Sequence, residues 1–198
     1  QHSKSFHSWF GNLPGIKVAL PATAFDAKGI LLESIFGEDP TIIIEHRSLF
    51  GLKDHVPKEP YRVKFGKAVI RKAGKDITVV SLGCMLVETL KAAKILKKEK
   101  IDIEVIDPRT LTPLDKETII NSVKKTGRLA VVDPGWQSFG ASAEIITSVI
   151  EKYSNYLKAS PIRINFPDSH TPMSQNLEKK YYIDEQKIVE KIKENFKT

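Results

Sequence analysis

A histidine beside a serine opens the chain, in the tripeptide Gln1-His2-Ser3. An imidazole gains and loses a proton near physiological pH, so His2 has the chemistry of a general acid or base. A histidine at the start of a chain is more often a solvated residue without a catalytic role. The residues that follow are needed to decide between these two interpretations.

A second candidate is the segment 133–144, in which Trp136 and Phe139 lie between Gly135 and Gly140. The segment follows a predicted strand and precedes a predicted helix, so it lies where open α/β sheets bind ligands or partners. It is either a tight turn that buries its aromatic rings or a surface that contacts another domain or subunit. Under the second interpretation Trp136 and Phe139 are interface residues, because large aromatic side chains often anchor interfaces.

Two further features favour structural roles. Asp107-Pro108-Arg109-Thr110 combines an acid, an arginine and a hydroxyl just past a predicted strand, and we interpret it as an internal ion pair that shapes a loop. Cys84 is the only cysteine, which excludes an internal disulfide and any CxxC pair. Its apolar surroundings, residues 79–87, predict a small buried core residue.

Composition excludes several classes of protein. The chain lacks a G-x-G-x-x-G motif, a P-loop, a G-x-S-x-G motif and an H-E-x-x-H motif, and also the Gly-Asp-Gly type of thiamine diphosphate motif. Its net charge is +7, but the lysines alternate with acids along helical segments, which favours a solvated surface over nucleic acid binding. An acidic protein partner is the alternative. No apolar run is long enough to span a bilayer, so no membrane is expected.

Strand-like and helix-like segments alternate along the chain, which predicts an α/β fold with a mostly parallel sheet. The predicted strands are 16–20, 41–45, 67–71, 77–82, 103–106, 129–132 and 162–166. The predicted helices are 25–36, 85–98, 112–126, 141–152 and 184–196. For the third helix, Thr112 is the expected cap and Pro113 the first helical residue. Residues 46–62 interrupt the alternation and predict a linker or domain crossing.

Ordered short motifs resemble the beta subunit of thiamine-dependent 2-oxoacid dehydrogenases, with the pyruvate type the most similar. Residues 1–5 look like the QHSQS of that family, and residues 26–31 like its DAKGLL. Residues 106–115 are similar to IDLRTLxPLD, and Gly135-Trp136 also matches. Each motif is weak alone, but the ordered set covers nearly the whole chain.

The resemblance implies a domain organisation. Residues 1–55 correspond to the second half of a pyrimidine-binding domain with a parallel sheet, 56–62 to a linker, and 63–198 to a transketolase C-terminal-type domain. It also implies that His2 lies in the substrate channel, where it assists proton transfer or reductive acylation of a lipoyl group. The implied partners are the alpha subunit, a second beta subunit and the dihydrolipoyl acyltransferase core.

The departures from the family pattern matter equally. Lys4 stands where the family has Gln, and Pro108 where it has a branched apolar residue. The family's glutamate that activates the cofactor lies upstream of these motifs, and its partner subunit holds the diphosphate and magnesium. We therefore expect the C-terminal part of a longer subunit that binds no thiamine diphosphate or Mg alone and is inactive in isolation. In a bacterium the expected location is the cytoplasm, with a mitochondrion or plastid as the eukaryotic alternatives.

Two other interpretations stay open. The chain could derive from another member of the transketolase superfamily, such as transketolase or deoxyxylulose-phosphate synthase. It could also be a non-catalytic module for dimerisation and docking. The Gly-Trp-x-x-x-Gly pattern of residues 135–140 favours the dehydrogenases.

Overall fold

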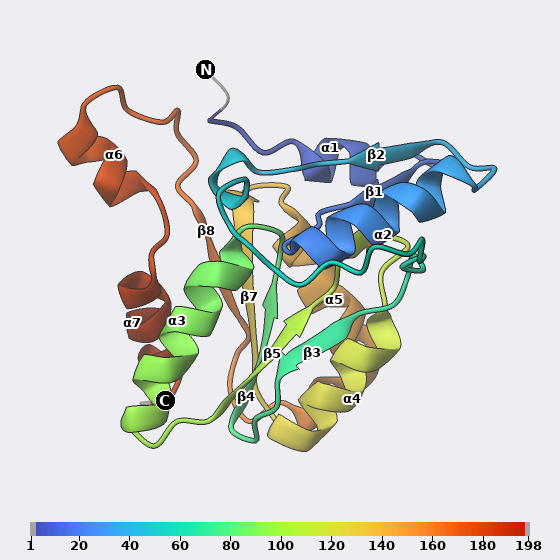
Figure 1. Ribbon diagram of the computed structural model, residues 1–198. Coiled ribbons are helices and arrows are strands. Elements are labelled where there is room, and N and C mark those ends of the chain that lie inside the picture. The colour runs from blue at the N-terminus through green and yellow to red at the C-terminus, as the bar shows by residue number, and fades with distance from the viewer. Residues whose placement is uncertain (1–2, 197–198) are drawn as a thin grey trace.

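A computed structural model describes residues 3–196, and its larger unit is a three-layer α/β arrangement (Figure 1). At its centre is a five-stranded sheet. In spatial order the strands are β3 (Val69–Lys72), β5 (Ile103–Asp107), β4 (Ile77–Ser81), β7 (Leu129–Trp136) and β8 (Ile162–Phe166). All neighbouring strands are parallel except β3, which runs antiparallel to β5 at one edge. The predicted α/β class with a mostly parallel sheet is confirmed.

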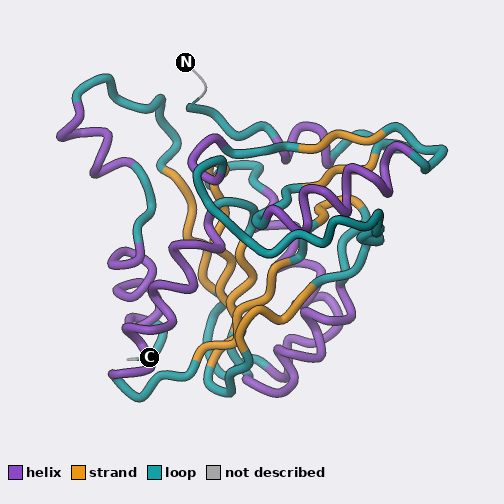
Figure 2. Tube along the Cα trace, viewed as in Figure 1, coloured by secondary structure: helices purple, strands orange, loops and turns teal. Residues whose placement is uncertain are grey.

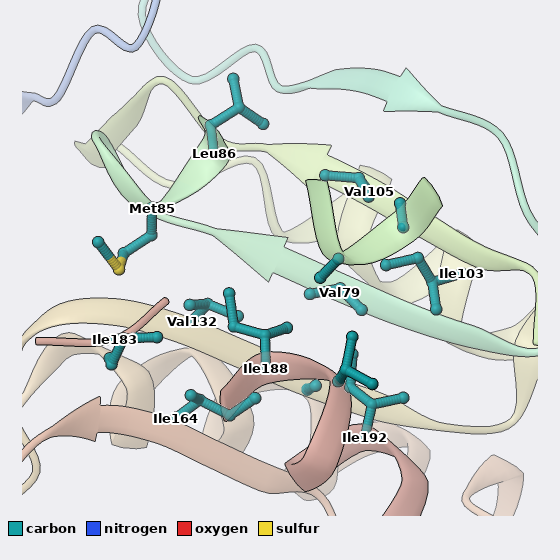
Figure 3. Close-up of a cluster of buried hydrophobic side chains, with 14 of the residues drawn as sticks. Val79, Met85, Leu86, Ile103, Val105, Val132, Ile164, Ile183, Ile188 and Ile192 are labelled. Carbon is teal, nitrogen blue, oxygen red and sulfur yellow. The ribbon is translucent and has the colours of Figure 1, made fainter. Parts of the chain in front are cut away.

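Helices cover both faces of this sheet. Successive strand residues point to opposite sides, and because they are apolar on both sides, each face is buried against helices. Val79 and Val132 face α3 (Met85–Lys98) and α7 (Glu185–Glu194), and Figure 3 shows this apolar layer. Val80 and Val131 pack into a second layer with residues of two helices on the other side. Those helices are α4 (Lys116–Thr126) and α5 (Ala141–Tyr153). Continuous apolar strands therefore indicate a doubly covered sheet here.

A smaller sheet lies across one end of the larger one (Figure 1). Its strands, in spatial order, are β2 (Thr41–Ile43), β1 (Lys17–Ala19) and β6 (Thr110–Thr112). The first two are parallel, whereas β6 comes from the second half of the chain and runs antiparallel to β1. The helices α1 (His7–Gly11) and α2 (Ala24–Ile35) accompany this sheet. Strand pairing therefore joins the two halves of the chain.

Residues 44–68, which connect β2 to β3, contain no strand or α-helix (Figure 2). They include the short 3-10 helix η1 (Arg47–Leu49). The segment packs on α2 through specific contacts. Lys28 donates hydrogen bonds to the carbonyls of Pro57, Lys58 and Glu59. The rings of Phe25 and Tyr61 stack with centroids 4.4 Å apart. The division into domains at residues 56–62 stays a prediction.

Two predicted elements differ markedly from the structure, and two short helices were not predicted. The helix expected from Thr112 and Pro113 begins at Lys116, because Thr112 pairs in β6 and Asp115 supplies the cap. β7 continues past its predicted end at residue 132, since an irregular pairing with β8 accommodates the Pro-Gly pair. The two helices that the sequence did not predict are the 3-10 helix η2 (Ser154–Tyr156) and α6 (Gln175–Tyr181).

Within residues 3–196, none of the helices combines the length and the apolar character that crossing a membrane needs.

Candidate functional site

A cavity of about 180 Å³ lies where the carboxyl ends of strands from both sheets meet. Three chain segments that follow β1, β2 and β4 line it, and Lys4 and Ser5 form a further wall. The lining residues beyond these two are Leu20, Pro21, Ile44, Glu45, His46, Arg47, Gly83 and Cys84. This edge is where open α/β sheets bind ligands. The cavity is therefore the candidate site.

A buried hydrogen-bond relay, Ser5–His7–Asp133, holds the wall formed by Lys4 and Ser5 in place. His7 Nδ1 lies 2.8 Å from the Ser5 hydroxyl oxygen, and His7 Nε2 lies 2.8 Å from Asp133 Oδ1. His7 and Asp133 are both fully buried, although 126 residues separate them in the sequence. The relay therefore fastens the segment that follows His2 and Ser3 to the end of β7.

Further contacts strengthen the junction between α1 and the start of α5. Gly140, the N-cap residue of α5, has no side chain to cap the helix, and the hydroxyl of Ser8 accepts a hydrogen bond of 3.0 Å from the Ala141 amide instead. A Cβ at Gly135 would lie 3.1 Å from His7 Cε1, so a larger residue there would require the histidine to shift by a few tenths of an ångström. The two segments are therefore shaped to fit each other.

His46 is a titratable side chain of the cavity whose ring nitrogens can be assigned as donor and acceptor. Its Nδ1 accepts a hydrogen bond from the Ser48 amide, so the neutral ring carries its proton on Nε2. Burial lowers the pKa of His46, which favours that neutral form. His46 also lines an adjacent cavity of about 190 Å³. It can therefore donate to, or exchange a proton with, a ligand at this edge.

Cys84 is buried in the wall of the cavity, as predicted. Burial raises the pKa of its thiol to about 12, so the thiol stays protonated and unreactive at neutral pH. Its contribution to the cavity is shape.

The Asp107–Arg109 segment is an ionic joint between the two halves of the chain, consistent with the predicted structural role. Asp26 on α2 accepts from Arg71 and, at 3.2 Å, from Arg109. Arg71 also donates to Asp107 Oδ2 at 2.8 Å, and Asp107 Oδ1 accepts from the Arg109 amide. Asp26 and Asp107 are both fully buried, so each carboxylate depends on these partners.

Trp136 and Phe139, the predicted interface residues, have different environments. Trp136 is half-buried, and its indole N–H donates to the Ser169 carbonyl at 3.0 Å. Its ring also meets that of Phe6 edge-on, with centroids 6.1 Å apart. Phe139 is 99% exposed and has a left-handed φ of 56°. Only Phe139 is thus wholly free for a partner, and their role at an interface stays a prediction.

His2, the predicted catalytic residue, lies outside the described residues. The sequence interpretation did not identify Ser5, His7, His46 or Asp133 as members of one site. The available signals were a histidine in a short amphipathic segment and an aspartate at the end of an apolar strand. Neither signal reveals the other partner, because pairing across 126 residues depends on the fold.

The comparison with known proteins agrees with this architecture. Residues 66–188, more than half of the chain, match the family described as "Transketolase, C-terminal domain". The chain belongs to this family. The transketolase C-terminal domain accounts for the whole five-stranded sheet, from β3 to β8.

Similarity extends beyond this domain to named relatives. The pyruvate dehydrogenase E1 component subunit beta of Acholeplasma laidlawii is 43% identical over 175 residues, which are 88% of this chain and 54% of that protein. The acetoin:2,6-dichlorophenolindophenol oxidoreductase subunit beta of Cupriavidus necator is 40% identical over 181 residues, 91% of this chain and 54% of that protein. The chain thus spans about half the length of these relatives. The predicted resemblance to dehydrogenase beta subunits is confirmed.

A solved structure supports the fold independently. It is described as a split gene transketolase in an inactive beta4 tetramer and has a TM-score of 0.78 and 25% sequence identity to this chain. The match covers 96% of this chain and 60% of that one, so it includes the small sheet as well as the larger one.

The described residues do not fit a whole thiamine diphosphate molecule. The cavity measures about 180 Å³. Sites that enclose ligands of drug size measure about 300–1,000 Å³. Glu45 supplies the only carboxylate among the residues that line the cavity, and within residues 3–196 no group of three His, Cys, Asp or Glu side chains is arranged to hold a metal ion. Enclosing the cofactor requires groups beyond those described.

Proposed function

We propose that this chain is the C-terminal part of the beta subunit of a thiamine-dependent 2-oxoacid dehydrogenase of the pyruvate type. The complete enzyme oxidatively decarboxylates a 2-oxoacid and transfers the resulting acyl group to a lipoyl group. The chain alone is inactive. In a bacterium the enzyme is cytoplasmic.

One observation carries the proposal. Lys4 and Ser5, which directly follow the Gln-His-Ser segment, line a cavity at the sheet edge where ligands bind. The resemblance to dehydrogenase beta subunits assigns the substrate channel to that segment. The cavity is thus lined by residues that closely follow His2 in the sequence, which supports an acid–base role for His2.

The cofactor and partners follow from the same proposal. Thiamine diphosphate and Mg belong to the assembled enzyme, with the alpha subunit supplying the diphosphate and metal site that this chain does not provide. A second beta subunit and the dihydrolipoyl acyltransferase core complete the assembly.

Replacing His2 tests the proposed role. In the full-length beta subunit assembled with its alpha subunit, His2→Ala should slow acylation of a lipoyl domain by about a hundredfold to ten-thousandfold, the usual contribution of a general acid or base. Single-turnover acylation measures this step directly.

The exposed His55 provides the matched control, and His55→Ala should leave acylation unchanged. Thermal unfolding should be alike for the two variants. Acylation at the wild-type rate in His2→Ala would remove His2 from the chemistry.

A further inference from the structure

The protons of the Ser5–His7–Asp133 relay can be assigned from its partners. Asp133 Oδ1 accepts from the Gly135 amide at 2.7 Å, and Oδ2 accepts from the Ser142 amide at 3.0 Å. Both carboxylate oxygens accept from amide groups, and we assign a proton to His7 Nε2 as the further donor to Oδ1. In the neutral ring, Nδ1 then accepts from the Ser5 hydroxyl. Each group in the relay thereby has a definite role.

The relay compensates for the weakness of α1 as an isolated helix. α1 has five residues and no side-chain cap, and a helix this short is unstable without tertiary contacts. Its contacts with the rest of the chain include the bond from His7 to Asp133 and the bond from the Ala141 amide to Ser8. A buried apolar residue at position 7 could fill the space, but it would leave a buried carboxylate one donor short.

The relay also has a direction, from the core to the cavity. Asp133 and His7 are fully buried, whereas Ser5 is half-buried and lines the cavity beside Lys4. His2 precedes Ser5 by three residues in the sequence. A hydrogen bond at each nitrogen fixes the orientation of the imidazole ring, and with it the position of Ser5 in the cavity wall.

We propose that His7 and Asp133 are positioning residues, which hold Lys4 and Ser5, the residues directly after the Gln-His-Ser segment, in the wall of the cavity. The proposal rests on the proposed function of His2. It predicts that the side chain at position 7 must form both hydrogen bonds, and that a side chain of similar volume without them is not sufficient.

Two substitutions of His7 separate these requirements. A glutamine at this position retains both bonds, since its amide NH₂ can donate to Asp133 and its carbonyl can accept from Ser5. A leucine fills similar space and retains neither bond. His7→Leu should therefore loosen the segment, whereas His7→Gln should behave like the wild type.

Amide hydrogen exchange in the chain itself is the first measurement. In His7→Leu, exchange at the Trp9 and Phe10 amides, which donate to the Phe6 carbonyl, should rise about tenfold to hundredfold, the effect of losing a hydrogen bond to a charged group. Exchange in α3 should stay unchanged, and His7→Gln should keep the wild-type protection of the Trp9 and Phe10 amides. The exposed-site control His55→Gln should show no change.

Lipoyl acylation by the assembled full-length enzyme is the second measurement. His7→Leu should lower the acylation rate at saturating substrate, whereas His7→Gln should acylate at nearly the wild-type rate. The variant with the faster amide exchange should therefore also be the one with the slower acylation. Unchanged exchange in His7→Leu, or an equal loss of acylation in both variants, would overturn the proposal.

Ser5→Ala covers the case in which His7→Leu does not fold, because it removes only the half-buried end of the relay. It should raise exchange at the Trp9 and Phe10 amides, and unchanged exchange there would also overturn the proposal. His2→Ala tests the proposed function separately, since it leaves the relay in place. If His2→Ala acylates normally while His7→Leu loosens the segment, the proposed role of His2 fails and the anchoring of the segment stands.

Discussion

Asp26 illustrates how a single residue joins distant parts of this fold. Its carboxylate binds Arg71 and Arg109, which lie 45 and 83 residues later in the sequence. The sequence indicated an ion pair near Asp107 and Arg109 because opposite charges stood together at a strand end. It could not indicate that Arg109 binds Asp26 while Asp107 binds Arg71, since these contacts join segments far apart in the sequence and depend on the pairing of β6 with β1.

Removing the charge of Asp26 should destabilise the chain strongly. Asp26→Asn leaves two guanidinium groups short of a partner in a buried setting, and breaking a buried ion pair typically costs about 3–5 kcal/mol. Urea denaturation at neutral pH measures the loss in the free energy of unfolding.

Glu33 on the same helix is a suitable control, because its nearest ion pair, with Arg62, spans 4.0 Å at the partly exposed surface. Glu33→Gln should change stability by no more than about 0.5 kcal/mol. Similar losses in the free energy of unfolding for the two variants would mean that the buried ion pairs of Asp26 stabilise the fold no more than a surface pair does.

At the scale of helices and strands, local signals predicted what local residues decide. The bounds of α3 and β8 agree with the predicted ones, and α4 ends at Gly127, whose φ of 74° suits glycine. The start of α4 was harder to predict, because two residues could have served as its N-cap. Thr112-Pro113 and Asp115 both resemble helix starts, and pairing of Thr112 with Val18 in the small sheet decides in favour of Asp115.

Asp115→Ala should lower stability at pH 7 by about 0.5–2 kcal/mol, the usual value of an N-cap. Burial alone would raise the pKa of Asp115, but hydrogen bonds from the Ala68 and Thr118 amides lower it overall from its ordinary 3.8. The folded protein therefore favours the ionised form, and this stabilisation is lost as the pH falls through the lowered folded pKa. The advantage of the wild type over Asp115→Ala should shrink below pH 3.8.

Urea denaturation at pH 7 and pH 3 measures that difference. Glu117→Gln, an exposed change in the same first turn, should alter stability little at either pH. An Asp115→Ala deficit of equal size at both pH values would contradict the role of the ionised carboxylate.

For the molecule as a whole, exposed apolar side chains are the candidate contacts with other chains. Phe139 is 99% exposed, and Trp9 on α1 is 68% exposed. The sequence predicted Trp136 and Phe139 as a pair, because spacing cannot distinguish a ring that packs internally from one that faces solvent. Trp136 also contributes to the core and binds Ser169, so replacing it would disturb the fold as well as any interface.

Phe139→Ala therefore gives the clean test of an interface at this edge. In the full-length protein it should weaken assembly with the alpha or second beta subunit about tenfold or more, as expected for a central aromatic anchor. Analytical ultracentrifugation measures the dissociation constant.

Tyr156→Ala is the control, because Tyr156 follows α5 and so lies at the opposite end of the sheet from Phe139. It should leave assembly unchanged. Equal dissociation constants for wild type and Phe139→Ala would show that the loop is only a turn.

The central claim is most directly tested by acylation of a lipoyl domain with pyruvate, thiamine diphosphate and Mg. The full-length protein that contains this chain should acylate the lipoyl domain when combined with its alpha subunit, and the chain alone should not. Acylation by the chain alone would contradict the account. So would an assembled enzyme that transfers two-carbon units between sugar phosphates and leaves the lipoyl domain unmodified.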